Sequence, residues 1–245
     1  MNELFGQRNH TPLYVEVRDT VLGRISTGAW KPGEMLPSES AIGQELGVSQ
    51  GTVRKALDDL AAQNVVVRRQ GKGTFVAEHT AERALFHFFH IETNANTRAL
   101  PTNSQVYSCR RRKADKTEID ALKLDRDARI VEIKRVREMA GEPAISETVI
   151  VPAALFADID KRTLNDVPNE LYQLYEQKYG ITVHRAVERV RAVGASDIDA
   201  KLLGKKPGTP LLEIERIAET VDGRPVELRV SRCLTEGRHY VSTIV

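Results

Sequence analysis

Residues 38–76 constrain the fold more strongly than any other part of this 245-residue sequence. Two stretches with apolar residues at helical spacing are separated only by the tight turn "GVS" at 47–49. Asn64 ends the second helical pattern, and "VVVRRQGKGTFV" (65–76) then reads as two short strands around a glycine-rich tip. The second helix has a single apolar stripe, at Val53, Ala56, Leu57, Leu60 and Ala61. This order predicts two crossed helices followed by a β-hairpin.

A further helix is predicted before this segment. Thr11 and Pro12 form a helix-start signal, apolar residues follow at helical spacing, and Gly28 marks the end. Ser38 is the predicted N-cap of the next helix. Three helices and a hairpin describe a winged helix-turn-helix, in which the start of the third helix reaches base edges in a major groove. The N-terminal part is therefore predicted to be mostly α-helical, with a β-hairpin wing.

Net charge does not support DNA binding, but the distribution of charge does. The formal net charge of the chain is +2, and residues 1–78 carry nine Lys or Arg and nine Asp or Glu. From Gly47 to Val76, however, five cations occur with only two acidic residues, Asp58 and Asp59. A local positive potential attracts phosphate whatever the total charge.

We predict DNA contacts from the start of the third helix and from the hairpin tip, because hydroxyls, backbone N–H groups and cations there suit phosphate oxygens. The "GKGT" stretch does not fit a nucleotide-binding loop, since Val66 and Gly73 stand where that motif requires Gly and Ser or Thr. A small helical bundle with a solvated polar face would not need such a basic tip. The predicted DNA-binding residues are Ser38, Ser49, Gln50, Gly51, Thr52, Arg54, Lys55, Arg68, Arg69, Gln70, Gly71 and Lys72.

These motifs resemble a known family. The stretch "GAWKPGEMLPSESAIGQELGVSQGTVRKALDDLAAQNVVVRRQGKGTFVA" is similar to the DNA-binding domain of GntR-family bacterial transcription regulators, and its "RRQGKGTFVA" ending is typical of the HutC subfamily. The resemblance covers residues 12–77. Ser40 and Gln50 stand where family members usually carry arginines that contact DNA. Because glutamine suits adenine better than guanine, we expect an altered operator sequence.

The second half of the sequence contains a duplication. Residues 120–143 and 199–225 each hold a helix end, a strand with the pattern E-I-x-R and a Gly-x-Pro turn, and each is followed by a strand with a glutamate, Glu147 or Glu227. A helix is predicted in 168–180 and an alternating strand in 181–193. We therefore expect one antiparallel sheet with helices, an α+β domain.

The second half is also similar to the UTRA effector-binding domain of HutC-type regulators, which has a chorismate lyase-like fold. The resemblance lies in "RVRE" (135–138), "SETVIVP" (146–152), "ELYQLYEQKYGI" (170–181) and "GRPVEL" (223–228). The predicted organisation is a DNA-binding domain at 1–77, a polar linker at 78–84 and an effector-binding and dimerisation domain at 85–245.

Arg135 and Arg137 are the predicted anion-binding pair. Two residues apart on a strand, they share a face, and two guanidiniums suit a carboxylate or phosphate. In the second copy Arg216 matches Arg135, but Ala218 replaces Arg137, so the fold does not need the second arginine. The alternatives are a surface arginine or one paired with Glu147. The resemblance adds further pocket residues, and we include one from a loop at 93–100 expected to close over the pocket: Glu147, Glu170, Tyr172, Glu227 and Arg98.

The predicted effector is a carboxylated metabolite. Glu170 stands where phosphosugar-binding relatives usually carry serine, and Cys233 where they often carry tyrosine. A carboxylate at that position repels a phosphate. We expect a small anion, such as an aromatic or heteroaromatic acid, with N–H groups for the glutamates.

No metal or cofactor is predicted. His87 and His90 in "FHFFHI" would lie on opposite faces of a strand of the sheet. The chain lacks an export signal and a long apolar segment, so we expect a cytoplasmic protein with reduced Cys109 and Cys233. The predicted function is a homodimeric repressor of a catabolic operon, released from a palindromic operator by its effector. The alternatives are an autoregulated lyase-like enzyme and a nonspecific architectural DNA-binding protein.

Overall fold

The computed structural model describes residues 12–77, 90–93, 101–165 and 171–242. The chain divides into two compact units, Met1–Glu78 and His79–Val245. Within the described residues, no helix is long and apolar enough to cross a bilayer. The predicted linker at 78–84 and the predicted pocket residues Arg98 and Glu170 lie outside the described residues.

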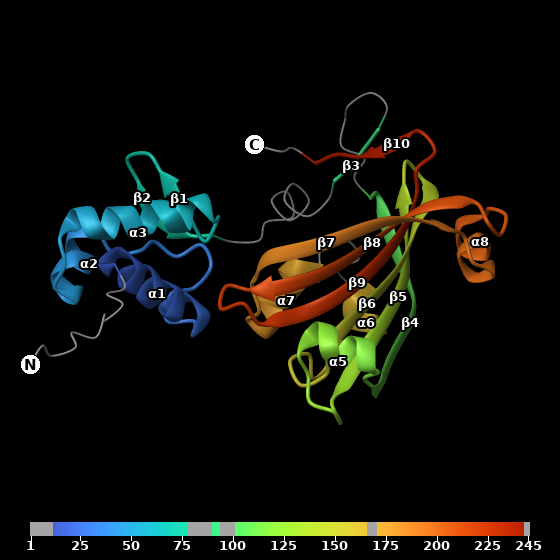
Figure 1. Ribbon diagram of the computed structural model, residues 1–245, viewed down its shortest axis with the longest axis horizontal. Helices are drawn as coiled ribbons and strands as arrows, with labels where there is room; N and C mark the ends of the chain where they lie inside the picture. Colours follow the sequence, from blue (N-terminus) through green and yellow to red (C-terminus); the bar gives the residue numbers. More distant parts are fainter. Residues whose placement is uncertain (1–11, 78–89, 94–100, 166–170, 243–245) are drawn as a thin grey trace, which may run out of the picture. The chain divides into compact units, whose positions relative to one another are not determined.

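The N-terminal unit is the predicted winged helix-turn-helix (Figure 1). Its helix α2 begins where the Ser38 hydroxyl accepts a hydrogen bond from the Ala41 N–H at 3.2 Å, and it ends at Gly47, whose φ is 67°. Pro12 occupies the N-cap position of α1, so this helix starts one residue later than predicted. The elements are α1 (Leu13–Ser26), α2 (Glu39–Leu46), α3 (Gln50–Ala62), β1 (Val66–Arg69) and β2 (Gly73–Val76).

The turn between α2 and α3 depends on close backbone packing. A Cβ atom on Gly43 would lie 2.9 Å from the backbone oxygen of Val48, so any side chain there would force the turn apart. The predicted apolar stripe of α3 is buried against α1 and α2, with Ala61 at its edge only half-buried. Four residues of the stripe are 0% exposed: Val53, Ala56, Leu57 and Leu60.

The wing is attached to the unit through a pairing that the sequence did not predict. The connector between α1 and α2 runs beside β2, where the Leu36 N–H donates to the Thr74 oxygen at 2.8 Å. The Val76 N–H donates to the Glu34 oxygen at 2.8 Å. The base of the hairpin is therefore held by a third chain segment, which leaves only its tip free to project.

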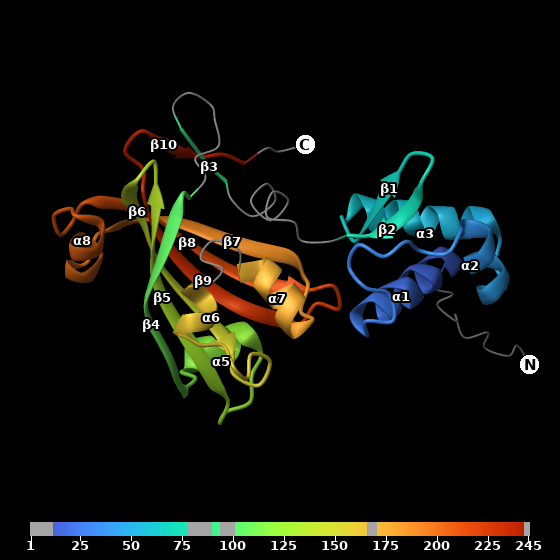
Figure 2. The same cartoon turned by 180° about the vertical axis from the view of Figure 1, so that it is seen from behind.

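The C-terminal unit is built on an antiparallel six-stranded sheet with the order β4-β5-β6-β9-β8-β7 (Figure 2). A separate ribbon pairs β3 with β10. The elements are β3 (Ile91–Thr93), β4 (Asn103–Lys113), α5 (Lys116–Leu122), β5 (Arg129–Met139), β6 (Glu142–Pro152), α6 (Lys161–Asn165), α7 (Leu171–Tyr179), β7 (Val183–Gly194), α8 (Asp197–Leu203), β8 (Pro210–Thr220), β9 (Pro225–Leu234) and β10 (Arg238–Tyr240).

The strand order reflects the predicted duplication. Each copy runs strand, helix, strand, strand, and the two copies meet at the β6–β9 pair. Both connecting helices begin with a capping box, at Asp115 in α5 and at Ser196 in α8. The edge strand β4 was not predicted, because its polar and charged residues gave no apolar run.

The register corrects the predicted match between the two glutamates. Glu147 lies opposite Arg135, whereas the corresponding position opposite Arg216 holds Arg229. Glu227 instead lies opposite Ala218. When the two copies are aligned on their Gly-x-Pro turns, Glu147 matches Arg229, and Glu227 lies two residues before that position. Glu147 and Glu227 are therefore not equivalent positions.

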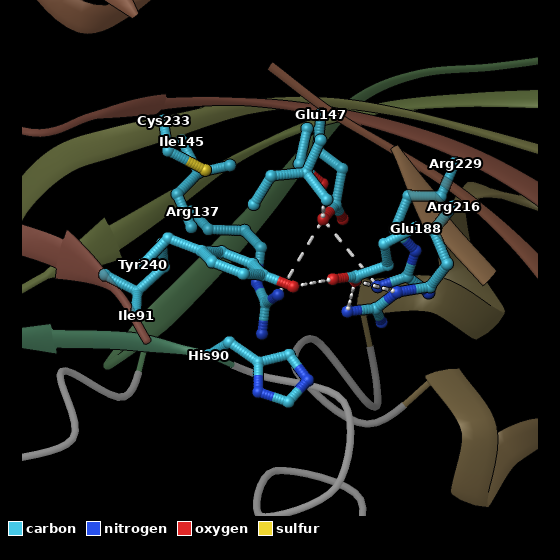
Figure 3. Close-up of a pocket in the computed structure, with 12 residues that line it drawn as sticks. His90, Ile91, Arg137, Ile145, Glu147, Glu188, Arg216, Arg229, Cys233 and Tyr240 are labelled. Carbon is cyan, nitrogen blue, oxygen red and sulfur yellow. Dashed lines mark hydrogen bonds and ion pairs between the residues drawn. The ribbon is translucent and has the colours of Figure 1, made fainter. Parts of the chain in front are cut away.

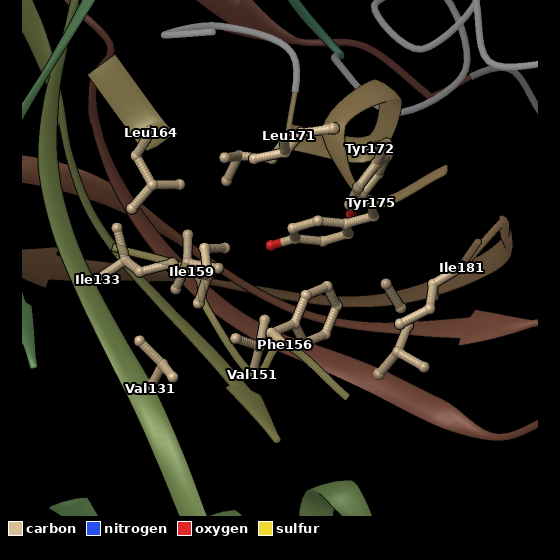
Figure 4. Close-up of a cluster of buried hydrophobic side chains, with 14 of the residues drawn as sticks. Val131, Ile133, Val151, Phe156, Ile159, Leu164, Leu171, Tyr172, Tyr175 and Ile181 are labelled. Carbon is tan, nitrogen blue, oxygen red and sulfur yellow. The ribbon is translucent and has the colours of Figure 1, made fainter. Parts of the chain in front are cut away.

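The main core lies on the face of the sheet that α6 and α7 cover (Figure 4). Val131 and Ile133 of β5 point into it, together with Phe156, whose ring centroid lies 4.6 Å from that of Tyr175. Ile130, one residue out of phase, packs instead with α5. The helices α5 and α7 therefore cover opposite faces, as strand alternation requires.

The predicted strand at 86–91 differs from the structure where the structure describes it. Residues Ile91–Thr93 form β3, which pairs with β10 and not with the six-stranded sheet. His87 lies outside the described residues.

Candidate functional site

The exposed first turn of α3 is preorganised by its cap. The Ser49 hydroxyl accepts a hydrogen bond from the Thr52 N–H at 3.2 Å and lies 2.9 Å from the Thr52 hydroxyl. Gln50 and Gly51 are exposed. A Cβ atom on Gly51 would meet only the Ser49 hydroxyl, at 3.8 Å, so the fold itself leaves room for a side chain there.

The wing tip presents the predicted residues to solvent. Arg69 pairs with Gly73, which leaves Gln70, Gly71 and Lys72 as an exposed three-residue loop. Gly71 has φ of 69°, a conformation that favours glycine. The Arg69 guanidinium lies 4.6 Å from the centroid of the Phe75 ring.

One charged residue of this surface was not predicted from the sequence. Glu39, at the start of α2, accepts hydrogen bonds from Gln50 and Arg54 of α3 and from Arg68 of the wing. Arg68 also pairs with Asp58 at 2.7 Å. The local excess of positive charge is therefore smaller than the sequence indicated. The sequence did contain a signal for Glu39, because this residue directly follows the Ser38 cap of α2. In a helix-turn-helix, α2 crosses behind the start of α3.

The second candidate site is a pocket in the C-terminal unit, on the same face of the sheet as α7 (Figure 3). The pocket is narrow and partly open to solvent. Among the described residues, five strands of the sheet line it, together with His90, Ile91 and Tyr240 of the β3–β10 region. Its charged lining residues are Arg137, Glu147, Glu188, Arg216 and Arg229.

Glu147 lies at the centre of the buried charges. It accepts hydrogen bonds from Arg135 and, at 2.9 Å, from the Ser231 hydroxyl. The guanidinium nitrogens of Arg229 and Arg137 lie 3.7 and 3.8 Å from its carboxylate. Burial alone would raise the pKa of Glu147, but these arginines outweigh it and the pKa falls below its usual value. Glu147 is therefore held as a carboxylate.

Arg137 lies among three other arginines, Arg135, Arg229 and Arg216. Its pKa is lowered from the ordinary arginine value to about 9 by burial and by Arg135, with smaller contributions from Arg229 and Arg216. Glu147 offsets these effects only in part. The protein environment thus disfavours the positive charge that Arg137 carries at neutral pH, and an anion placed beside it would relieve that cost.

Two carboxylates connect the lining arginines to neighbouring elements. Glu188 accepts from Arg216 at 2.6 Å and from the Tyr240 hydroxyl at 2.5 Å. Glu227, beside the pocket, accepts from Arg229 at 2.9 and 2.7 Å and from two hydroxyls of α7. One is that of Tyr172, whose pKa is raised to about 12 by burial and by Glu227. The pocket arginines are thus linked to α7 and to β10.

The structure separates the predicted effector residues into two groups. Arg137 and Glu147 line the pocket. Arg135, Tyr172 and Glu227 are buried and contact the lining residues without lining the pocket, so the two guanidiniums do not form the simple fork that their spacing predicted. The lining residues that were not predicted to bind the effector include Glu188, Arg216, Arg229, Ser231 and Tyr240. Arg216 had a signal, because it repeats Arg135; Arg229 had one too, because it shares a face with Glu227.

A winged helix-turn-helix joined to a sheet domain with a charged pocket defines a ligand-responsive, DNA-binding transcription regulator. The comparisons agree. Residues 13–76 match the family described as "Bacterial regulatory proteins, gntR family", and residues 98–237 match the "UTRA domain". The chain belongs to the GntR family and is a regulator of the HutC type, not an enzyme.

Two relatives and one solved structure illustrate the similarity. The chain is 31% identical to the mannosyl-D-glycerate transport/metabolism system repressor of Escherichia coli, over 89% of this chain and 90% of that protein. It is 31% identical to the histidine utilization repressor of Pseudomonas aeruginosa, over 94% and 89%. The ligand-binding domain of a protein described as a GntR-family regulator from Bordetella bronchiseptica aligns with a TM-score of 0.62 at 31% identity, over 65% of this chain and 98% of that one.

Proposed function

We propose that this regulator represses a catabolic operon and is released from DNA by a small carboxylate that binds beside Arg137. Both relatives described above are repressors named for compounds that carry a carboxylate, mannosyl-D-glycerate and histidine. The protein acts as a cytoplasmic homodimer on a palindromic operator, since two symmetry-related winged domains would match two half-sites.

The observation that carries this proposal is the burial of Arg137 in a pocket lined by two further arginines. Its side chain is only 5% exposed, and Arg216 and Arg229 line the same cavity. The second copy of the repeat has Ala218 at the matching position, so the sheet can form without this guanidinium. A buried charge that the fold does not require is a candidate for ligand binding.

The remaining lining residues favour a carboxylate over a phosphate. Glu147 and Glu188 both face the cavity, and they repel a phosphate dianion more strongly than a ligand with one negative charge. As acceptors, the same carboxylates suit N–H or O–H groups of the ligand. The rings of His90 and Tyr240 lie 5.5 Å apart at the cavity and offer an aromatic surface to a ring-bearing acid.

The arginines also provide a route for the response. Arg229 binds Glu227, which holds the Tyr172 and Tyr175 hydroxyls of α7. A carboxylate that draws Arg229 toward itself weakens this attachment and favours a different position of α7. Repression ends when the shifted population has a dimer geometry that no longer matches the spacing of the half-sites.

The test compares ligands that differ in their acid group. Histidine is paired with histidinol phosphate, and glycerate with glycerol phosphate, in thermal-shift and calorimetric titrations of the full-length protein. We expect binding of a carboxylate member, and a roughly tenfold to hundredfold loss of its affinity in Arg137→Ala. The control is Arg189→Ala, which removes an arginine that is 75% exposed on β7.

Two results would contradict the proposal. Tighter binding of the phosphate members would exclude the carboxylate assignment. Full affinity in Arg137→Ala would place the anion site elsewhere. Equal affinity for an operator duplex and for a scrambled duplex, measured by fluorescence anisotropy, would instead favour the nonspecific architectural role.

A further inference from the structure

One carboxylate connects the three elements of the DNA-binding surface. Glu39 is the first residue of α2, and its side chain is only 15% exposed. It accepts from Gln50 Nε2 at 3.2 Å, from Arg54 Nε at 3.0 Å and from Arg68 Nη1 at 2.9 Å. These donors come from the first turn of α3, from its second turn and from the wing strand β1. In the described part of this unit, no other carboxylate connects α2, α3 and the wing.

The contact fixes the orientation of the Gln50 amide. An ionised carboxylate only accepts hydrogen bonds, so the amide must approach Glu39 through its nitrogen. Burial would raise the pKa of Glu39, but Arg68, Arg54 and Gln50 together lower it, and the group stays ionised. The amide oxygen and the second N–H of Gln50 then remain available. One acceptor and one donor side by side are what the major-groove edge of adenine pairs with.

The same carboxylate, together with Asp58, neutralises Arg54 and Arg68. Arg54 and Arg68 carry two positive charges, which Glu39 and Asp58 balance with two negative charges. A glutamine in place of an arginine at position 50 adds no further cation. The cluster therefore attracts the DNA backbone only weakly, whatever the base sequence. At the same time it presents the oriented amide of Gln50 to one base.

We propose that Glu39 is a positioning residue for sequence discrimination: it orients Gln50 toward an A·T base pair and limits nonspecific attraction by Arg54 and Arg68. The inference rests on the proposed base-reading role of Gln50. If Glu39 served only to hold the wing against α3, its loss would weaken binding to every DNA sequence alike.

The experiment measures discrimination and not affinity alone. An operator duplex is first selected in vitro with the full-length protein. Fluorescence anisotropy then gives dissociation constants for the operator and for a scrambled duplex across a salt series. In Glu39→Ala we expect nonspecific binding to be as tight as in the wild type or tighter, with a steeper salt dependence, because Arg54 loses the Glu39 carboxylate and Arg68 keeps only Asp58. The ratio of specific to nonspecific affinity should fall by about five- to a hundredfold, the discrimination carried by one bidentate base contact.

Two further variants separate the causes. Glu39→Gln should retain part of the discrimination, because its amide oxygen still accepts from Gln50; a loss equal to that in Glu39→Ala would overturn the orienting role. Glu45→Ala is the matched control. It removes another α2 glutamate, whose partner is Arg24, and it should leave the affinity ratio unchanged.

The outcomes also distinguish this inference from the role of Gln50 itself. The double variant Glu39→Ala/Gln50→Ala should discriminate no worse than Gln50→Ala alone, because Glu39 discriminates between sequences through Gln50, while its effect on Arg54 and Arg68 is the same for every sequence. An unchanged ratio in Gln50→Ala would refute the base-reading role. An unchanged ratio in Glu39→Ala, with a reduced ratio in Gln50→Ala, would refute the positioning role only. A parallel loss of both affinities in Glu39→Ala would show that the residue is merely structural.

Discussion

The protein uses the same residue types, arginine and glutamate, in two clusters that differ chiefly in burial. Around Glu39 in the DNA-binding unit, the side chains of Arg54 and Arg68 are 58% and 38% exposed. Around Glu147 in the effector unit, Arg135, Arg137 and Arg229 are 1%, 5% and 8% exposed. One cluster is open to solvent and the other is almost closed.

The difference explains what each cluster can do. Exposed ion pairs contribute little to stability, so Arg54 and Arg68 can exchange a carboxylate for a phosphate at small cost. Buried charges interact strongly and are expensive to leave unbalanced, so the cluster around Glu147 responds to the addition or loss of a single charge. The first arrangement suits reversible contact with DNA, and the second suits detection of an anion.

The largest expected effect comes from removal of the central buried carboxylate. Glu147→Ala leaves three buried guanidiniums without their shared partner and should destabilise the C-terminal unit by about 3–5 kcal/mol. Glu39→Ala, which removes a carboxylate whose partners Arg54 and Arg68 are exposed, should cost less than about 1 kcal/mol. The chain has one tryptophan, Trp30, so its fluorescence follows the DNA-binding unit, while hydrogen exchange of the sheet amides follows the other unit.

The comparison between the clusters fails if the two variants cost the same. Equal destabilisation by Glu147→Ala and Glu39→Ala would mean that burial does not distinguish them. A shift of the Trp30 transition in Glu147→Ala, with unchanged exchange in the sheet, would contradict the assignment of the effect to the effector unit.

A smaller effect should appear on acidification. The folded-state pKa of Glu147 lies below its ordinary value of 4.5, so its stabilising contribution is complete above that value and is lost as the pH falls toward the lowered pKa. Glu188 and Glu213, also paired with arginines, shift in the same direction. Between about pH 6 and about pH 3 we expect the sheet to lose roughly 1–3 kcal/mol more than the DNA-binding unit. Urea unfolding at each pH, with the same two probes, measures this difference.

The smallest expected change in stability is that of Gly51→Ala. This variant separates an effect on folding from an effect on DNA contact. Gly51 has an ordinary helical backbone and space for a Cβ atom, so Gly51→Ala should raise stability by at most about 1 kcal/mol. If DNA approaches this turn closely, the same methyl group should weaken operator binding severalfold. Unchanged affinity in anisotropy titrations would show that the backbone of α3 does not approach DNA at this position.

The DNA-binding unit could be predicted from the sequence because its signals are local. The Ser38 cap, Gly47 and the apolar stripe of α3 each act within one or two helical turns, and the structure places them as predicted. Glu39 was missed because its partners lie 11, 15 and 29 residues away along the chain. The connector that pairs with β2 was missed for the same reason.

The pocket was less predictable. Arg137 and Glu147 could be found from spacing and from the repeat, but the exclusion of Arg135 from the pocket depends on its hydrogen bond to Glu147 across the strands. Tyr240, on a strand that pairs with β3, approaches Glu188 from 52 residues away. No periodicity in the sequence could place these two side chains together.

The sequence by itself determined the order of elements, the winged domain, the duplicated sheet and the difference between its two copies at Arg137 and Ala218. These follow from alternation, capping and turn chemistry, which act between near neighbours. Only the tertiary structure decided which charges neutralise one another and which face a cavity. The strength of a charge pair depends on distance and burial, and both are set when strands and helices far apart in the sequence pack together.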